Sequence, residues 1–108
     1  MTSAAEPELI RRYFELAVGR DTTSYFAQFA EDATVEDEGA ERHGVDAIRA
    51  WRTEVPPVSY LVEAIQPVDG GWDAAVDIAG DFPGSPVRLG FHFEFDTTGH
   101  IRRLTIRP

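Results

Sequence analysis

The chain has 108 residues, of which 43% are hydrophobic and 11% aromatic, and its 19 acidic and 10 basic side chains give a formal net charge of −9. This length fits a single domain, residues 1–108, and the apolar content is typical of a folded chain rather than a disordered one. The negative charge argues against nucleic acid or an anionic membrane as the partner.

Two residue types are absent, and each absence excludes a kind of chemistry. All 10 basic residues are arginine, which excludes a lysine Schiff base and a P-loop lysine. There is no cysteine, which excludes disulfides, thiolate nucleophiles and thiolate metal sites.

No apolar run approaches the roughly 20 residues of a membrane span, and the first residues lack the apolar segment of a signal peptide. We therefore expect a cytoplasmic protein.

The first half of the chain is predicted to form three helices, because apolar residues recur there at helical spacing between good starting and stopping residues. The predicted helices run from Pro7 to Gly19, from residues 21–23 to residues 30–32, and around residues 47–51 up to the Pro56-Pro57 pair. A short strand over Thr34–Asp37, followed by a polar loop to Gly44, is predicted between the second and third helices.

The second half is predicted to form strands separated by hairpin-type breaks. These strands cover residues 58–68, 72–82, 87–95 and 101–106. Helices followed by a run of antiparallel strands indicate an α+β domain in which the helices pack on one face of a curved sheet.

Strand alternation assigns the side chains of this sheet to two faces. In the strand over residues 87–95 one face carries Leu89, Phe91, Phe93 and Phe95, and the other carries Arg88, Gly90, His92 and Glu94. The aromatic face is expected to point toward the helices. Arg102, Arg103 and Arg107 are interpreted as ion-pair partners for the many carboxylates or as dimer contacts.

The stretch ATVEDEG, residues 33–39, places three carboxylates in a row after a strand-like start. Alternation puts Asp37 on the inward side with Val35 and leaves Glu36 and Glu38 in solvent. Carboxylates in apolar cavities tend to have raised pKa values, which suits them to proton transfer. The alternative is that the strand ends at Glu36 and that Asp37 only caps a turn.

An ordered series of motifs resembles the nuclear-transport-factor-2-like superfamily, specifically its ketosteroid-isomerase and SnoaL-like polyketide-cyclase branch. The motifs are RRYFELAVGRD (residues 11–21), YFAQFAEDATVEDEG (25–39), HGVDAIRAW (43–51) and FHFEFDTTGHIRRL (91–104). The resemblance implies a cystatin-like α+β barrel, in which a cone-shaped, curved antiparallel sheet surrounds the helices and a deep apolar pocket. It also implies a homodimer through the outer sheet face that carries Arg88, His92 and Glu94.

In the ketosteroid isomerases, a tyrosine on the first helix donates a hydrogen bond to the substrate carbonyl, and an aspartate at the end of the first strand moves the proton. Tyr13 and Asp37 match these two residues and are the expected catalytic pair. Phe91 stands where those enzymes have a second, protonated acid, and Arg52 stands where a supporting tyrosine lies. Because losing one oxyanion donor costs about 3 to 4 kcal/mol, a proficient steroid isomerase is not expected.

The expected substrate-binding residues follow from the continuity of core and pocket in this fold. They are Phe26, Trp51, Phe82, Phe91, Leu104 and His43, the last of which either reaches the pocket mouth or helps to start the third helix. His92 and Glu94 could form a metal site if His43 or His100 joined them, but an outward face that meets solvent or a second subunit is favoured. No metal or organic cofactor is expected.

The leading hypothesis is a small enzyme with an apolar pocket, an isomerase or cyclase acting on a hydrophobic carbonyl compound such as a polyketide or steroid-like molecule. Asp37 would act as general acid and base, and Tyr13 as hydrogen-bond donor. One alternative is a non-catalytic ligand-binding or dimerisation module of the same fold, which Phe91 favours. Another is a hydrolase or dehydratase that uses Asp37 as general acid.

Overall fold

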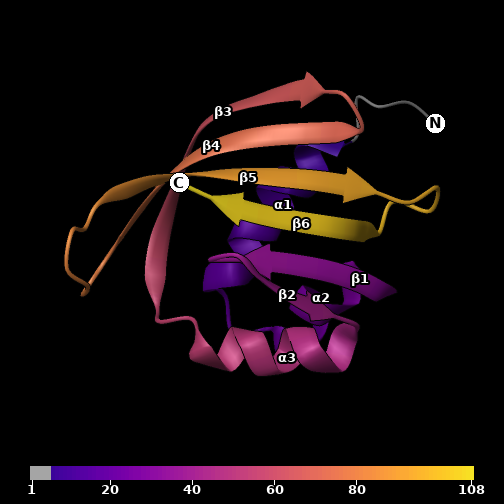
Figure 1. The fold of residues 1–108 in the computed structure, drawn as a ribbon, viewed down its shortest axis with the longest axis horizontal. Helices are drawn as coiled ribbons and strands as arrows, with labels where there is room; N and C mark the ends of the chain where they lie inside the picture. Colours follow the sequence, from indigo (N-terminus) through magenta and orange to yellow (C-terminus); the bar gives the residue numbers. More distant parts are fainter. Residues whose placement is uncertain (1–5) are drawn as a thin grey trace.

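A computed structural model of the chain describes residues 6–108, which form three helices and six strands (Figure 1). The helices are α1 (Glu6–Val18), α2 (Thr22–Ala27) and α3 (Val45–Glu54). The strands are β1 (Phe29–Asp37), β2 (Ala40–His43), β3 (Val58–Val68), β4 (Gly71–Gly80), β5 (Val87–Phe95) and β6 (Ile101–Arg107). Within this part of the chain, no helix has the length and apolar character needed to cross a membrane.

The strands form one mixed sheet in the order β2-β1-β6-β5-β4-β3. The predicted α+β class, with helices against a curved sheet, is confirmed, and so are the antiparallel pairings among β3, β4, β5 and β6. The expectation of a wholly antiparallel sheet is wrong at one junction, because β1 pairs with β6 in parallel. The long connection between them, residues 38–100, returns the chain so that both strands run in the same direction. Asp37 therefore pairs with Ile106 at a shared end of the sheet.

The boundaries around β1 differ from the prediction. The second helix ends at Ala27, and β1 begins at Phe29 rather than at Thr34. The predicted loop before α3 is also wrong, because residues 40–43 form β2 and pair with β1. Glu38 and Gly39, with φ of 54° and 79°, make the two-residue turn between these strands. Two positive φ values in succession are typical of a type I′ hairpin turn, whose twist matches that of the flanking strands.

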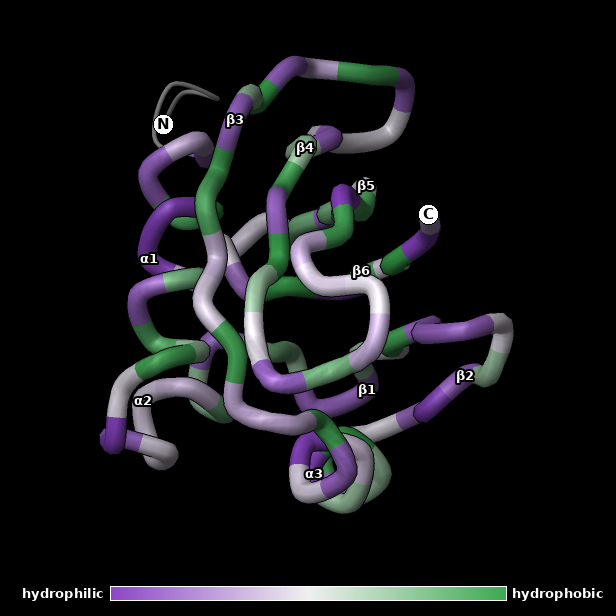
Figure 2. The backbone as a smooth tube through the Cα atoms, turned by 90° about the vertical axis from the view of Figure 1, so that its left-hand side faces the viewer, coloured by the Kyte–Doolittle hydropathy of each residue, from purple (hydrophilic) through white to green (hydrophobic). Residues whose placement is uncertain are grey.

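The helix α1 lies on one face of the sheet and packs its apolar side against it (Figures 1 and 2). The aromatic side chains of β5 point to this inner face, as predicted, and Tyr13 of α1 lies among them with its ring centre 5.4 Å from that of Phe93. Phe14 of the same helix contacts Phe91 edge to face at 5.0 Å. The core therefore consists largely of rings shared between α1 and β5.

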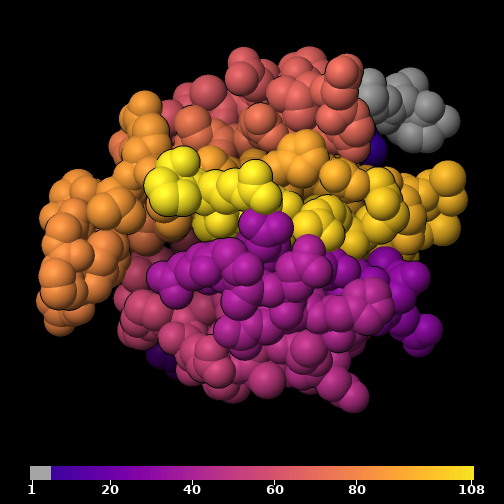
Figure 3. All heavy atoms as spheres, viewed as in Figure 1, coloured from indigo at the N-terminus to yellow at the C-terminus, as the bar shows by residue number. Residues whose placement is uncertain are grey.

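The opposite surface of the sheet, called the outer face from here on, is turned toward the viewer in Figure 3, with β6 lying between β5 and β1. The arginines there form ion pairs, as predicted. Arg103 lies 3.2 Å from Glu36, and Arg107 lies 3.0 Å from the same carboxylate. The expectation that Glu36 is solvated is wrong, because these two guanidinium groups leave its side chain only 13% exposed.

Candidate functional site

A mainly apolar cavity of about 380 Å³ lies on the inner face, at the end of the sheet where β1 and β6 stop (left in Figure 1). Its walls come from α1, α3 and five strands. The lining residues are Tyr13, Asp37, Glu38, Trp51, Arg52, Val55, Pro56, Val58, Tyr60, Ile78, Phe82, Val87, Leu89, Phe91 and Ile106. A small number of polar groups converging in an apolar cavity is the usual composition of a small-molecule site.

Asp37 reaches this cavity because it is the last residue of β1 and lies on the same side as the fully buried Val35. The strand includes Asp37, so the alternative in which it ends at Glu36 is wrong. Trp51 of α3 donates from Nε1 to Oδ2 of Asp37 over 3.0 Å. This bond holds one carboxylate oxygen against α3, and the other oxygen has no bond to described residues.

Tyr13 lines the same cavity from α1 and shares a hydrogen bond of 2.9 Å with the hydroxyl of Tyr25 on α2. Burial, followed by the effect of Tyr25, raises the pKa of Tyr13 well above its usual value, and burial raises the pKa of Tyr25 to about 12. Both phenols therefore stay protonated at neutral pH. When Tyr25 donates to Tyr13, the Tyr13 proton is free to be donated to a ligand.

Tyr25 supplies a hydroxyl partner for Tyr13 that the sequence analysis did not assign. The resemblance places such a residue at the end of the third helix, where this chain has Arg52, and the structure supplies the hydroxyl from α2 instead. The sequence holds a signal, since Tyr25, Phe26 and Phe29 form an aromatic stripe and a buried tyrosine hydroxyl usually has a hydrogen-bond partner.

Arg52 enters the cavity from the last turn of α3. Its guanidinium lies 4.8 Å from the ring centre of Tyr25 and 5.9 Å from that of Trp51, and its Nη2 donates to the carbonyl of Ala17 over 2.7 Å. These contacts connect α3 to the C-terminal end of α1 and place a positive charge beside the two tyrosines.

Three of the predicted substrate-binding residues, Trp51, Phe82 and Phe91, line the cavity together with Tyr13 and Asp37. Phe91 is buried against Phe14, so the wall where the isomerases place a second acid is apolar here.

The other three predicted residues, Phe26, His43 and Leu104, do not line this cavity. Phe26 packs on the edge of Tyr25 and beneath the guanidinium of Arg49, outside the cavity wall. His43 is an exposed residue at the end of β2, with its Nδ1 atom 2.9 Å from Oγ1 of Thr34. Leu104 is enclosed by the core. Strand alternation can indicate the face on which a residue such as Leu104 lies, but not where along the strand the cavity begins.

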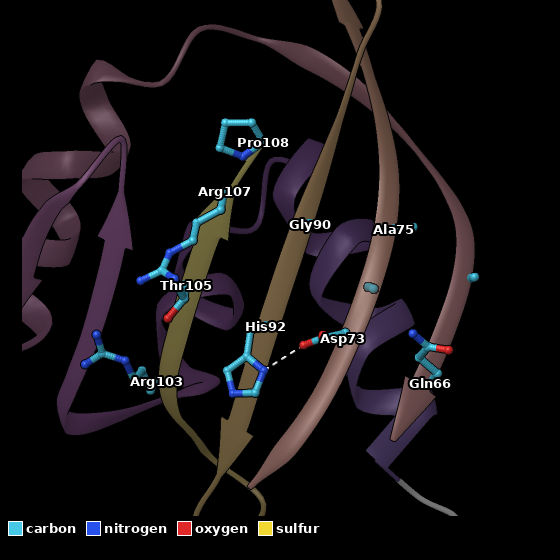
Figure 4. Close-up of a pocket in the computed structure, with 11 residues that line it drawn as sticks. Gln66, Asp73, Ala75, Gly90, His92, Arg103, Thr105, Arg107 and Pro108 are labelled. Carbon is cyan, nitrogen blue, oxygen red and sulfur yellow. Dashed lines mark hydrogen bonds and ion pairs between the residues drawn. The ribbon is translucent and has the colours of Figure 1, made fainter. Parts of the chain in front are cut away.

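A hollow larger than this cavity, of about 620 Å³, lies on the outer face (Figure 4). Its lining mixes charged and polar side chains, among them Asp73, His92, Thr105 and Arg107, with small apolar ones. His92 lies 2.7 Å from the carboxylate of Asp73 and 3.1 Å from that of Glu94. Neither of the other histidines joins this group, and no cluster of three or more potential metal ligands occurs within residues 6–108. The inner cavity, which brings the expected catalytic pair together, is thus the candidate active site.

No protein-family model and no curated protein matches the chain. Several solved structures do match the chain. A protein of Sinorhizobium meliloti, described as a "putative polyketide cyclase", is 34% identical over 99% of this chain and 100% of its own, with a TM-score of 0.83. A protein of Sphaerobacter thermophilus is 27% identical over 92% of this chain and 91% of its own, with a TM-score of 0.78.

A third solved structure has the same fold at lower identity. It is an NTF2-like protein of unknown function from Exiguobacterium sp. 255-15, 19% identical over 92% of this chain and 96% of its own, with a TM-score of 0.78. The Sinorhizobium meliloti protein is 34% identical to this chain over nearly the whole length of both, and the third structure shares the fold. The chain therefore belongs to the nuclear-transport-factor-2-like (SnoaL-like) superfamily.

Proposed function

We propose that this protein is a cofactor-independent enzyme that moves a proton next to a carbonyl group in a hydrophobic molecule, as an isomerase or a cyclase. The observation that carries the proposal is the shared cavity of Asp37 and Tyr13, one offering a carboxylate and the other a buried phenol. The description of the Sinorhizobium meliloti relative is consistent with the cyclase alternative.

In the proposed reaction, the free carboxylate oxygen of Asp37 removes a proton from the carbon beside the carbonyl. The electrons of the C–H bond move onto the carbonyl oxygen, and Tyr13 donates a hydrogen bond to the resulting enolate. For an isomerisation, Asp37 returns the proton to another carbon of the conjugated enolate. For a cyclisation, the enolate carbon attacks a second carbonyl carbon, a C–C bond forms, and the new alkoxide takes the proton from Asp37.

A non-catalytic ligand-binding module is the second candidate, and Phe91 favours it. The buried phenyl ring offers no hydrogen bond to an enolate, so the oxyanion would depend on Tyr13 and on whatever else lies in the cavity. A protein that only binds its ligand needs no such donor.

Deuterium exchange separates the two candidates even while the substrate is unidentified. Hydrophobic ketones and lactones that raise the melting temperature would be incubated with the protein in D₂O, and deuterium uptake beside the carbonyl would be followed by NMR. We expect Asp37→Asn to slow uptake by about 10² to 10⁴-fold, the usual contribution of a general base. The matched control is Glu36→Gln, which changes the neighbouring carboxylate on the outer face and should leave exchange intact. Unchanged exchange in Asp37→Asn refutes the mechanism, and binding without exchange supports the module.

A further inference from the structure

Arg52 is a cation in the cavity wall without a carboxylate partner. Five other arginines each have a carboxylate oxygen within 4.0 Å, namely Arg42, Arg88, Arg102, Arg103 and Arg107. Arg52 forms no such pair among residues 6–108, although this part of the chain contains all 19 acidic side chains. Four exposed arginines, Arg11, Arg12, Arg20 and Arg49, also lack such a pair among the described residues, but Arg52 is half-buried, and an unpaired guanidinium removed from water needs a physical reason.

Its contacts within the protein use only part of its binding capacity. A guanidinium carries five N–H donors, of which the carbonyl of Ala17 accepts one from Nη2 and the Tyr60 hydroxyl is a further partner. The ring faces of Tyr25 and Trp51 offset some of the cost of removing the charge from water, but they accept none of the in-plane hydrogen bonds. Arg52 therefore retains donors for a group in the cavity, and its planar fork matches a carboxylate in particular.

The negative and positive side chains of the cavity lie on opposite sides of it. Trp51 and Arg52 are consecutive on α3, so their side chains diverge by about 100° around the helix axis. Trp51 turns toward β1 and binds Asp37, whereas Arg52 turns toward α1 and Tyr25. The β1 side of the cavity is thus negative, with Asp37 and Glu38, and the helical side is positive.

We infer that Arg52 binds a carboxylate of the ligand, so that the substrate class is an apolar molecule that carries one carboxylate in addition to its carbonyl group. The carbonyl part of this statement rests on the proposed function, and the carboxylate part does not. A carboxylate at Arg52 is held away from Asp37 and Glu38 by repulsion, which leaves the apolar body of the ligand beside Phe91 and within reach of Asp37. One guanidinium facing two carboxylates favours a monoanion over a doubly charged phosphate ester.

The test compares 2-naphthoate with 2-naphthamide, which have the same shape and differ in charge, by isothermal titration calorimetry at neutral pH. We expect the wild-type protein to bind naphthoate at least about tenfold more tightly, the usual effect of a charge-assisted hydrogen bond. Arg52→Gln should abolish the preference, and Arg52→Lys should keep part of it because the charge remains. Arg49→Gln is the matched control, since Arg49 stacks on Phe26 outside the cavity and should leave the preference unchanged.

Equal binding of the acid and the amide by the wild-type protein overturns the inference, as does failure of naphthoate to bind, and neither result depends on whether a variant folds. A preference that survives in Arg52→Gln overturns it as well. The wild-type protein distinguishes this inference from the proposed function. If it prefers naphthoate to naphthamide while no ketone exchanges deuterium, the carboxylate site stands and the proton transfer fails. If the wild-type protein exchanges deuterium into a ketone but binds naphthoate and naphthamide equally, the proton transfer stands and the carboxylate site fails.

Discussion

Raising the pH above 10 should destabilise this protein through its two buried tyrosines. Tyr13 and Tyr25 are 1% and 3% exposed, and burial raises the pKa of both, that of Tyr25 to about 12. The usual value of 10.0 applies to the unfolded chain, which therefore loses its phenolic protons at a lower pH than the folded protein. The stability that these groups provide is fully present below pH 10 and is lost as the pH rises through the native pKa values.

The size of the loss follows from the shift. One pKa unit is worth about 1.4 kcal/mol, so the rise for Tyr25 from 10.0 to about 12 corresponds to a loss of about 3 kcal/mol, to which Tyr13 adds. The composition makes the effect easy to isolate. With no lysine and no cysteine in the chain, the three tyrosines are the only side chains that titrate in this range, because arginine keeps its proton.

Urea unfolding followed by far-UV circular dichroism, from about pH 8 to about pH 12, measures this dependence as a change in the free energy of unfolding. Tyr25→Phe should remove one ionisable group and flatten the upper part of the profile. The Tyr13→Phe/Tyr25→Phe double variant should flatten it further. A wild-type profile that stays level to about pH 12, or a double variant that loses as much stability as the wild type, would refute the assignment of the alkaline loss to these two phenols.

Three further predictions concern the sheet. Glu38→Asn should raise the free energy of unfolding by about 0.5 to 1 kcal/mol, because asparagine tolerates the φ of 54° better; Glu38→Ala controls for the lost charge and should give no such gain. Gly71→Ala should cost about 3 kcal/mol, because its Cβ would lie 2.1 Å from the Phe93 carbonyl oxygen, whereas Gly90→Ala should be almost neutral by the same denaturation assay. We also propose a homodimer through the outer face, and sedimentation that finds only monomers at micromolar concentration would contradict it.

The elements that alternation or helical spacing predicted correctly are those whose pattern is imposed by burial. The four strands of the second half match the prediction to within two residues at each end, because one face of each packs against the core. The same rule placed Asp37 inward from the position of Val35 alone. A period of two residues needs only local sequence to be recognised.

The elements that were missed depend on partners distant in the sequence. The strand β2 has no buried residue, so no hydrophobic pattern marks it, and it exists through its hydrogen bonds with β1 and the turn at Glu38. The parallel pairing of β1 with β6 joins segments about 70 residues apart, for which local sequence has no signal. In the cavity, the local sequence could not indicate that the hydroxyl of Tyr25 meets that of Tyr13, because the two residues lie on different helices.

The relation between Arg52 and the two tyrosines bears on the absence of an acid at position 91. Burial raises the pKa of Tyr13 and Tyr25, which weakens each phenol as a donor, and the Arg52 charge acts in the opposite direction on both. When Tyr25 is the donor of the bond to Tyr13, a cation over the face of its ring makes that hydroxyl a better donor, and hydrogen bonds in a chain polarise one another. In the proposed reaction, the positive charge on the helical side of the cavity would act on the oxyanion through Tyr25 and Tyr13, and Phe91 would contact the apolar part of the ligand.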